Sequence, residues 1–308
     1  MTDSQTRLGR VIAHHGQTVL IQTPNHDQWP CQYRSQQNAL VTGDWVHWQP
    51  DPYDPSQGII VNMAPRNNVL ARPHRHHRQA KPLAANIDQA LIVIAGQPAP
   101  IAHYIDRYLV ALKTLHIKPV LVINKMDQWD LSNQALKQFK TIYQSLNYPV
   151  YAVSATTGLG IESLQSQLNH QTSILLGQSG VGKSALLNAL AETHLANTGT
   201  VSTKSRLGKH TTTTAYLHTL PLERSIIDAP GIRQFNCWHL TAHDIRSGFI
   251  EFAPFYCRFR DCWHLESSAG CQVRSAYEQG HIATCRLDSY YRLLNEVTQQ
   301  QASYTKTK

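Results

Sequence analysis

The stretch Gly177-Gln-Ser-Gly-Val-Gly-Lys183-Ser184 decides the fold of this chain. It fits the pattern G-x-x-x-x-G-K-[ST], in which glycines let backbone N–H groups turn inward around phosphate oxygens. The apolar residues Ile174–Leu176 precede it, and the helix-forming run Ser184–Ala191 follows it. A strand, a glycine-rich turn and a helix N-terminus in this order predict a P-loop that binds nucleotide phosphates. The residues expected to line the nucleotide are Gly177, Gln178, Ser179, Gly180, Val181, Gly182, Lys183, Ser184 and Ala185.

Two side chains of this stretch have expected roles at the phosphates. Lys183 is expected to reach the β- and γ-phosphate oxygens, and it is therefore also a catalytic candidate. The Ser184 hydroxyl is expected to ligate Mg²⁺. The alternative is a glycine-rich turn without a ligand, which requires a chance match of the pattern between a strand and a helix.

A second motif, Asn124-Lys-Met-Asp127, predicts which base the nucleotide carries. It follows directly on the apolar run Val120–Ile123, where a loop that reads the base is expected. The Asp127 carboxylate can accept hydrogen bonds from both N1–H and the exocyclic amine of guanine, whereas adenine offers no such pair of donors. Asn124 is expected to brace the loop and contact the base edge, and the stem of Lys125 is expected to pack along the ring. The motif therefore indicates guanine.

Loops after two further strands complete the expected site. Ser154 and Ala155 follow the apolar run Val150–Val153, and a backbone N–H of this loop is expected to meet guanine O6. A D-x-x-G motif begins at Asp228, which is expected to hold Mg²⁺ through water. It ends at Gly231, whose N–H is expected to sense the γ-phosphate.

The segment Ser202–Thr214 lies between the P-loop and Asp228 and contains three cationic side chains and no acidic one. It ends in a run of threonines, of which Thr212 or Thr213 is expected to complete the Mg²⁺ shell in the triphosphate state. Thr212 is also a catalytic candidate. The segment is thus predicted to be a switch that orders on GTP, with an ordinary basic surface loop as the alternative.

The order of these motifs differs from that of Ras-like GTPases, in which the P-loop comes first. Here the N-K-x-D motif and the Ser-Ala loop precede the P-loop. Neighbouring termini can be joined and the chain opened elsewhere, so a circularly permuted sequence can still form the same sheet. Ile232 stands where Ras-like enzymes place the glutamine that orients water, so we expect slow intrinsic hydrolysis.

The first seventy or so residues predict a small β-barrel. Short runs rich in β-branched and aromatic residues alternate with Gly, Pro, Asn and Asp. These runs are Leu8–Ala13, Thr18–Gln22, Asp44–Trp48 and Gly58–Asn62. Five or so short strands suit an OB-fold, the commonest such barrel that binds nucleic acid, although an SH3-like barrel has a similar pattern.

After this barrel the chain changes character. Residues 72–82 combine two prolines with cationic side chains, which predicts a linker, with a strap that contacts phosphates as the functional alternative. From Leu83, strands and helices alternate, as in a parallel sheet with helices on both faces. We therefore predict an α/β multidomain protein with an OB-fold RNA-binding domain (1–72), a basic linker (73–82), a circularly permuted P-loop GTPase domain (83–235) and a mostly helical zinc-binding domain (236–308).

A cluster of cysteines and one histidine predicts the zinc site of this last domain. Cys257, Cys262, His264 and Cys271 place four soft or borderline ligands within fifteen residues. Three thiolates and an imidazole suit a closed tetrahedral Zn²⁺ site that holds a small domain together. Free core cysteines are the alternative, and Cys285 could replace one of the ligands.

Composition and charge limit the class of protein. No apolar run approaches the ~20 residues of a membrane span, and the N-terminus is polar, so we expect a cytoplasmic protein without a membrane partner. The formal net charge of +8 is spread along the chain, as for a surface that faces a polyanion. A basic protein without a nucleic-acid partner would show the same charge.

Taken together, these segments resemble the circularly permuted, small-ribosomal-subunit-dependent GTPases of the RsgA (YjeQ) family, and the match covers nearly the whole chain. The segments that carry the resemblance are Gly43–Val46, the N-K-M-D motif, the P-loop, Gly208–Thr213, the stretch from Asp228 to Phe235, the cysteine cluster, Tyr277–Gly280 and Arg286–Tyr290. The spacing from His264 to Cys271 is one residue longer than is usual in the family.

The resemblance implies an N-terminal OB-fold, a permuted GTPase core and a C-terminal zinc domain. It also implies binding to the small ribosomal subunit and its rRNA during late assembly, with GTP hydrolysis to GDP stimulated by that subunit. His239 matches a position where the family carries a candidate catalytic histidine. We expect a monomer with one structural Zn²⁺ and with Mg²⁺ bound together with GTP.

Two other functions compete with this hypothesis. The first is an RNA-binding module that uses GTP as a structural or regulatory ligand with negligible hydrolysis, which Ile232 motivates. The second is a P-loop kinase or transferase, which the N-K-x-D motif and the switch threonines disfavour.

Overall fold

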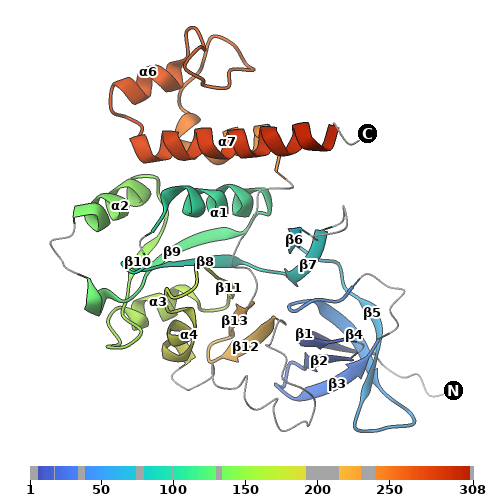
Figure 1. Cartoon of the computed structure of the whole chain (residues 1–308). Coiled ribbons are helices and arrows are strands. Elements are labelled where there is room, and N and C mark those ends of the chain that lie inside the picture. The colour runs from blue at the N-terminus through green and yellow to red at the C-terminus, as the bar shows by residue number, and fades with distance from the viewer. Residues whose placement is uncertain are drawn as a thin grey trace.

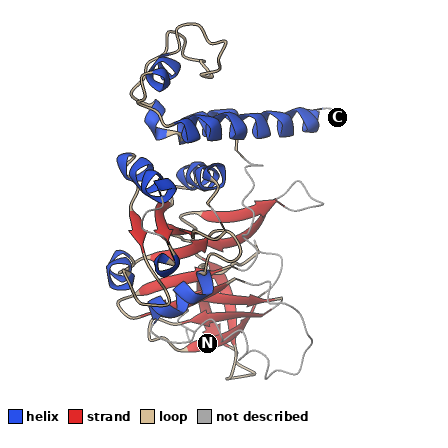
Figure 2. Cartoon of the chain, turned by 60° about the vertical axis from the view of Figure 1, so that its left-hand side comes forward, coloured by secondary structure: helices blue, strands red, loops and turns tan. Residues whose placement is uncertain are grey.

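The computed structural model describes residues 6–16, 18–33, 39–73, 80–98, 100–129, 134–191, 215–229 and 240–305. Within these ranges an eleven-stranded sheet runs through the molecule in the order β10-β9-β8-β11-β13-β12-β1-β2-β3-β5-β4. One end of this sheet closes into a barrel, and helices cover both faces of the other end (Figures 1 and 2).

The barrel is formed by the first five strands, which confirms the predicted N-terminal barrel. They are β1 (Arg7–His15), β2 (Thr18–Gln22), β3 (Gln28–Gln32), β4 (Trp45–Pro50) and β5 (Gly58–Met63). Pairing of β1 with β4 closes the ring. Alternate residues of these strands point inward, so Val19, Ile21, Val46 and Trp48 are fully buried in one core. Cys31 lies in the same core.

The second part of the sheet contains the strands expected to end at the nucleotide. They are β8 (Gln89–Ile94), β9 (Lys118–Ile123), β10 (Val150–Ala152), β11 (Thr172–Leu176), β12 (Tyr216–Leu220) and β13 (Arg224–Asp228). All neighbours among them are parallel except β12, which runs antiparallel to β13. The strand before the P-loop, β11, lies between β8 and β13. Strands β8 to β10 therefore precede β11 in sequence but flank it on one side in space, which is the arrangement that a permuted chain predicts.

The two faces of β8 explain why helices cover both sides of this sheet. All six residues of β8 are buried. Ile92 and Ile94 pack with α1 (Ala102–Thr114) and α2 (Gln134–Ser145), whereas Leu91 and Val93 pack with α3 (Ile161–Gln167) and α4 (Lys183–Ala191). Successive side chains of a strand point to opposite faces, so a continuous apolar run needs a layer of helices on each side. Figure 1 shows the two helix layers above and below the strands.

A hairpin occupies the region of the predicted basic linker. Strand β6 (Val69–Pro73) pairs antiparallel with β7 (Ala80–Ala85), and Arg72 lies opposite Lys81. The predicted linker at 73–82 therefore begins in β6 and ends in β7. Leu70 of β6 and Ala84 of β7 are buried, and this burial holds the two strands in place. Residues 74–79 lie outside the described part of the chain.

The barrel is joined to the parallel sheet by direct contacts. Ala13 of β1 pairs with Tyr216 of β12. The Thr42 hydroxyl donates to the carbonyl of Ala215 over 2.9 Å. Such pairing fixes the position of the barrel against the strand that follows the predicted switch segment.

The C-terminal part lies across the outer face of α1. It contains α5 (Ala242–Gly248), a 3₁₀ turn η3 (Ile250–Phe252), α6 (Gln272–Glu278) and the long α7 (Thr284–Thr305). The chain between α5 and α6 is mostly irregular, as Figure 2 shows. In Figure 1, α7 runs above α1 and α2.

A buried network of charges fastens α7 to the rest of the molecule. Arg286 is 1% exposed and pairs with Asp106 of α1 and, over 2.6 Å, with Glu251 of η3. The Tyr143 hydroxyl of α2 donates to Asp106 over 2.6 Å. Because removal of one partner leaves a buried charge uncompensated, this network favours one position of α7. None of the helices in the described ranges has the length and apolar composition to cross a membrane.

Candidate functional site

The carboxyl ends of four parallel strands meet at one edge of the sheet. Ile94 of β8 lies opposite Ile123 of β9, and Ile123 lies opposite Ala152 of β10. On the other side, Leu176 of β11 lies opposite Ile92 of β8. The loops that carry the N-K-x-D, Ser-Ala and P-loop motifs therefore leave the sheet at the same edge, which is where open α/β sheets bind ligands. Asp228 ends β13 beside them.

At two positions of the P-loop, both the backbone conformation and a close neighbouring atom favour glycine. Gly177 has φ +136°, and a Cβ there would lie 2.3 Å from the main-chain oxygen of Val93. Gly182 has φ +90°, and a Cβ there would lie 2.5 Å from the Asn124 amide nitrogen. Close approach to the neighbouring strand and loop thus requires glycine at both ends of the P-loop.

Asn124 joins three of the predicted motifs. Its side-chain amide donates to the carbonyl of Val181 over 3.0 Å and to that of Gly182 over 3.3 Å. Its side-chain oxygen accepts from the backbone N–H of Ala155 over 3.2 Å. The residue is 1% exposed, so these bonds are shielded from water. One side chain therefore ties the N-K-x-D loop to the P-loop and to the Ser-Ala loop.

Asp127 is oriented by the Ser-Ala loop. The Ser154 hydroxyl donates to Oδ1 of Asp127 over 2.5 Å, and it accepts from the backbone N–H of Thr157 over 3.1 Å. Ser154 is fully buried, which limits the rotamers of the pair. Lys125 has a left-handed backbone with φ 62°, and its ammonium group donates to the carbonyl of Gln97 over 3.3 Å. The structure therefore brings together all five residues predicted to contact the base.

Lys183 and Asp228 lie at the same edge of the sheet, at the end where the phosphates are expected. The Lys183 ammonium group donates to the carbonyls of Gly177 and Gln178 over 2.8 and 2.7 Å. Burial raises the pKa of the Asp228 carboxyl, and the nearby charge of Lys183 opposes this rise. Ser184 lies exposed in the first turn of α4. Ser179, Gly180 and Ala185 are part of the same loop and helix start.

Several predicted residues lie outside the described ranges. They are Thr212 and Thr213 of the switch segment, Gly231 of the D-x-x-G motif, Ile232 and His239. Their predicted roles stay predictions.

The four predicted zinc ligands converge. The thiol and imidazole atoms of Cys257, Cys262, His264 and Cys271 all lie within 4.8 Å of one another. Nδ1 of His264 is 3.5 Å from Sγ of Cys257 and 3.4 Å from Sγ of Cys271, and these two sulfurs are 3.8 Å apart. A tetrahedral Zn²⁺ with Zn–S of ~2.3 Å and Zn–N of ~2.05 Å requires S–S of ~3.8 Å and S–N of ~3.6 Å. The donor set and its spacing therefore fit a zinc ion.

Two other cysteines are placed away from this cluster. Cys285 lies in the first turn of α7, where it lines a cavity of about 320 Å³ together with Trp129 and Tyr143. Cys31 is buried in the barrel, and burial raises the pKa of its thiol to about 12. Neither replaces a ligand of the cluster, and Cys237 lies outside the described residues.

Sequence reasoning missed one residue that supports the loop predicted to read the base. The indole N–H of Trp129 donates to the main-chain carbonyl of Asn124 over 3.2 Å. A Cβ at Gly96 would lie 2.9 Å from this indole, so the ring is packed closely against the end of β8. Its contact is to backbone, and no side-chain pattern signals such a contact. Its position two residues after Asp127 was the available hint.

Comparisons with known sequences place these features in a family. The family model described as RsgA GTPase matches residues 63–238. A small ribosomal subunit biogenesis GTPase RsgA from Hahella chejuensis is 43% identical over 299 residues, which cover 95% of this chain and 85% of that protein. The protein of the same name from Pseudomonas aeruginosa is 41% identical and covers 93% of this chain and 84% of its own length.

Solved structures have the same architecture. YjeQ from Thermotoga maritima superposes with a TM-score of 0.77 at 31% identity, covering 96% of this chain and 99% of that one. YloQ, described as a circularly permuted GTPase, gives a TM-score of 0.75 at 21% identity over 97% of this chain and 98% of its own, which is a likeness of fold. The family model spans more than half of the sequence, and the relatives align along almost all of it. The converging motifs agree with both findings. The chain belongs to the RsgA GTPase family.

Proposed function

We propose that this GTPase binds GTP at the edge where β8, β9, β10 and β11 end, and acts in biogenesis of the small ribosomal subunit, which stimulates its turnover. The observation that carries the nucleotide assignment is the set of hydrogen bonds from Asn124 to the P-loop and to the Ser-Ala loop. The ribosomal assignment is supported by the name that the relatives at 41–43% identity share.

The roles of the residues at this edge follow from their places. The P-loop backbone from Gly177 to Gly182 cradles the phosphates, and Lys183 moves from its present carbonyl partners to the β- and γ-phosphate oxygens. Asp127 accepts from the guanine N1–H with one carboxylate oxygen and from the exocyclic amine with the other, while the Ser154 hydroxyl donates to Oδ1 and holds the carboxylate in place. The backbone of Ala155 meets guanine O6.

Mg²⁺ fits the phosphate end of the site. Ser184 at the start of α4 offers a hydroxyl, and Asp228 at the end of β13 offers a carboxylate for a bound water. When bound, the ion would supply positive charge that neutralises the charge developing on the phosphate oxygens. Thr212 or Thr213 is proposed to complete its shell, and Thr212 and His239 remain the catalytic candidates on the switch side.

The remaining parts provide the RNA-facing surface in this proposal. The barrel (1–72), the permuted GTPase domain (83–235) and the zinc domain (236–308) act as one cytoplasmic monomer that carries a net charge of +8. Positive charge spread over the chain favours contact with the rRNA backbone. Zn²⁺ at Cys257, Cys262, His264 and Cys271 would hold the irregular chain between α5 and α6 together.

The experiment is GTP hydrolysis by the purified chain alone and with small subunits, large subunits or free RNA at matched phosphate concentration. We expect strong stimulation by small subunits only, and its loss in Lys183→Ala. Equal stimulation by every RNA would contradict the ribosomal assignment. Binding of GTP with no hydrolysis under any condition would favour the RNA-binding module that uses GTP as a structural ligand.

A further inference from the structure

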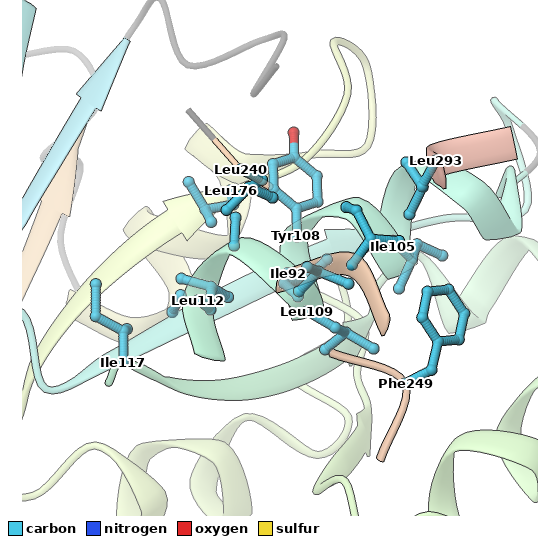
Figure 3. Packing of buried hydrophobic residues seen from close by; sticks show 14 of the residues in the cluster. Ile92, Ile105, Tyr108, Leu109, Leu112, Ile117, Leu176, Leu240, Phe249 and Leu293 are labelled. Carbon is cyan, nitrogen blue, oxygen red and sulfur yellow. The ribbon is translucent and has the colours of Figure 1, made fainter. Parts of the chain in front are cut away.

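The cavity beside Cys285 is a space that the described residues leave open between α1, α2 and the first turn of α7. Its volume is about 320 Å³. Ala102 lines it from the first turn of α1, and Phe139 lines it from α2. One turn further along α1, Ile105 belongs to a continuous apolar cluster that also contains Phe249 and Leu293 (Figure 3). The cavity is therefore a local feature of the beginning of α1.

The walls of this cavity are apolar and largely aromatic. Trp129, Phe139 and Tyr143 contribute three rings, and the centroids of the last two are 4.5 Å apart. The Tyr143 hydroxyl donates to Asp106 over 2.6 Å, so its proton is already used within the protein. Burial raises the pKa of the Cys285 thiol, which therefore stays neutral at neutral pH. Among the described residues that line the cavity, none carries a charge, and this favours a neutral ligand.

The volume of the cavity suits a small organic molecule. A dry apolar cavity of about 150 Å³ holds benzene, so about twice this volume suits two fused aromatic rings. Sites for small molecules typically have volumes of about 300–1,000 Å³, apolar and aromatic walls and few polar groups. Ala135 and Gln138 of α2 also line the cavity, and both are exposed to solvent. A ligand can therefore enter from the side of α2.

Trp129 belongs both to this cavity and to the N-K-x-D loop. Its ring lines the cavity, and its indole N–H donates to the main-chain carbonyl of Asn124 over 3.2 Å. The ring is packed closely against Gly96, where a Cβ would lie 2.9 Å from it. The part of the ring that faces the cavity has open space beside it instead. A ligand that packs there restricts the ring, and with it the Asn124 carbonyl.

We propose that this cavity is a binding site for a neutral molecule of two fused aromatic rings, and that its occupation strengthens binding of the guanine nucleotide through Trp129. The second part rests on the proposed binding of GTP at the edge of the sheet. A ligand between Trp129 and Phe139 immobilises the indole, whose N–H holds the loop that carries Asp127. This loop then loses less freedom when the nucleotide binds. Coupling of this kind is reciprocal, so the nucleotide also strengthens binding of the aromatic molecule.

Indole is the probe for the first test, which uses the full chain without nucleotide. Calorimetric titration should show saturable binding at one site with a Kd of about 0.1–1 mM, as for a buried ligand of this size. Ala102→Phe fills part of the cavity and should weaken indole binding at least about tenfold. Ala253→Phe is the matched control, because Ala253 is exposed and does not line the cavity. Absence of saturable binding to the wild type would overturn the proposal.

Alkylation of Cys285 tests the place of binding in the wild-type chain, so it does not depend on the folding of a variant. The Cys285 thiol is partly exposed and lines the cavity, and a bound ring blocks it. Peptide mass mapping after reaction with N-ethylmaleimide distinguishes Cys285 from the other cysteines. Saturating indole should slow this reaction at least about fivefold, with a midpoint equal to the calorimetric Kd. A Cys285 thiol that does not react in the free chain, or that reacts equally fast with indole, would overturn the site.

The link to the nucleotide is tested by titrating GDP with and without indole. Saturating indole should lower the Kd for GDP about fivefold, and saturating GDP should lower the Kd for indole by the same factor. Trp129→Phe keeps an aromatic wall but removes the N–H that bonds to Asn124, so indole should still bind while the coupling falls below about twofold.

Phe139→Leu is the control for this link, because Phe139 lines the cavity from α2 and is not part of the N-K-x-D loop. It should weaken indole binding and keep the fivefold effect on GDP once indole is saturating. A Kd for GDP that indole leaves unchanged in the wild type, or full coupling in Trp129→Phe, would overturn the link. A wild-type chain that binds indole but no guanine nucleotide would remove the proposed function, whereas one that binds GDP but no indole would remove this inference alone.

Discussion

The side-chain amide of Asn124 donates to the carbonyl of Val181 over 3.0 Å, so a residue of the N-K-x-D loop holds the P-loop, 57 positions away in the sequence. Both groups are buried, and the same amide also reaches Gly182. The loop predicted to read the base and the loop proposed to bind the phosphates are thereby kept close together, as a guanine nucleotide that contacts both would require. In the proposed complex, the contacts to the base and to the phosphates would therefore depend on one another through Asn124.

Substitution of Asn124 by alanine should weaken nucleotide binding strongly. It leaves the buried carbonyl of Val181 and the N–H of Ala155 without these partners. An unsatisfied buried group costs about 1–3 kcal/mol, so we expect GDP affinity to fall at least about tenfold. Fluorescence titration with a labelled GDP measures this. Asn62→Ala, in the exposed part of β5, is the control, and equal affinities of the two variants would contradict the bridging role.

Asp127→Asn should change the preferred base from guanine to xanthine. Because Ser154 donates to Oδ1 of Asp127, an asparagine keeps its carbonyl oxygen toward Ser154, where it also accepts from the N1–H of the base, and it turns its amine toward the position of the guanine amine. Xanthine carries an oxygen where guanine carries the amine. Competition of GTP and XTP for the variant should therefore favour XTP by about tenfold or more. Retained preference for GTP would show that Asp127 does not read the base.

Zinc content distinguishes the cluster from free cysteines. We expect one Zn²⁺ per chain in the wild type, and loss of the metal in Cys271→Ser with about 2 kcal/mol or more of lost stability. Cys285→Ser is the matched control, because Cys285 lies on α7 outside the cluster. Elemental analysis after gel filtration measures the metal. Equal zinc in both variants would show that the cluster does not hold it.

Acid should destabilise the protein through His218. Burial lowers the pKa of His218 on β12 to about 4. The unfolded chain takes up a proton near pH 6.5, whereas the folded chain does so only near pH 4, so stability falls as pH decreases between these values. At pH 5 the loss is about 2 kcal/mol relative to pH 8.

Urea unfolding at the two pH values checks this expectation for His218. In His218→Gln, the free energy of unfolding should differ correspondingly less between pH 8 and pH 5. The exposed His281→Gln should keep the difference of the wild type. If His218→Gln also keeps it, the acid sensitivity has another origin.

The features that the sequence predicted are those that local patterns encode. The strand before the P-loop, the glycines at Gly177 and Gly182, and the strand before Asn124 are each specified by neighbouring residues. The four zinc ligands lie within fifteen residues of one another, so their convergence needs only a short loop. The barrel followed from short runs of β-branched and aromatic residues separated by Gly, Pro, Asn and Asp.

Contacts between distant segments were not predictable in this way. The pairing of Arg286 with Asp106 joins residues 180 positions apart, and either residue alone resembles an ordinary surface charge on a helix. The hairpin of β6 and β7 was hidden because prolines and cations around Pro73 indicate a linker more strongly than a pair of strands.

The pairing of Arg286 with Asp106 also bears on how the protein is made. Synthesis proceeds from the N-terminus, and the central sheet with α1 is complete well before residue 286 leaves the ribosome. Until then, the Asp106 carboxylate lacks its guanidinium partner, and α7 does not yet cover it. A nascent or truncated chain that ends before Arg286 therefore lacks the guanidinium group that pairs with the Asp106 carboxylate. We therefore expect cellular proteases to degrade chains that lack the last helix faster than complete chains.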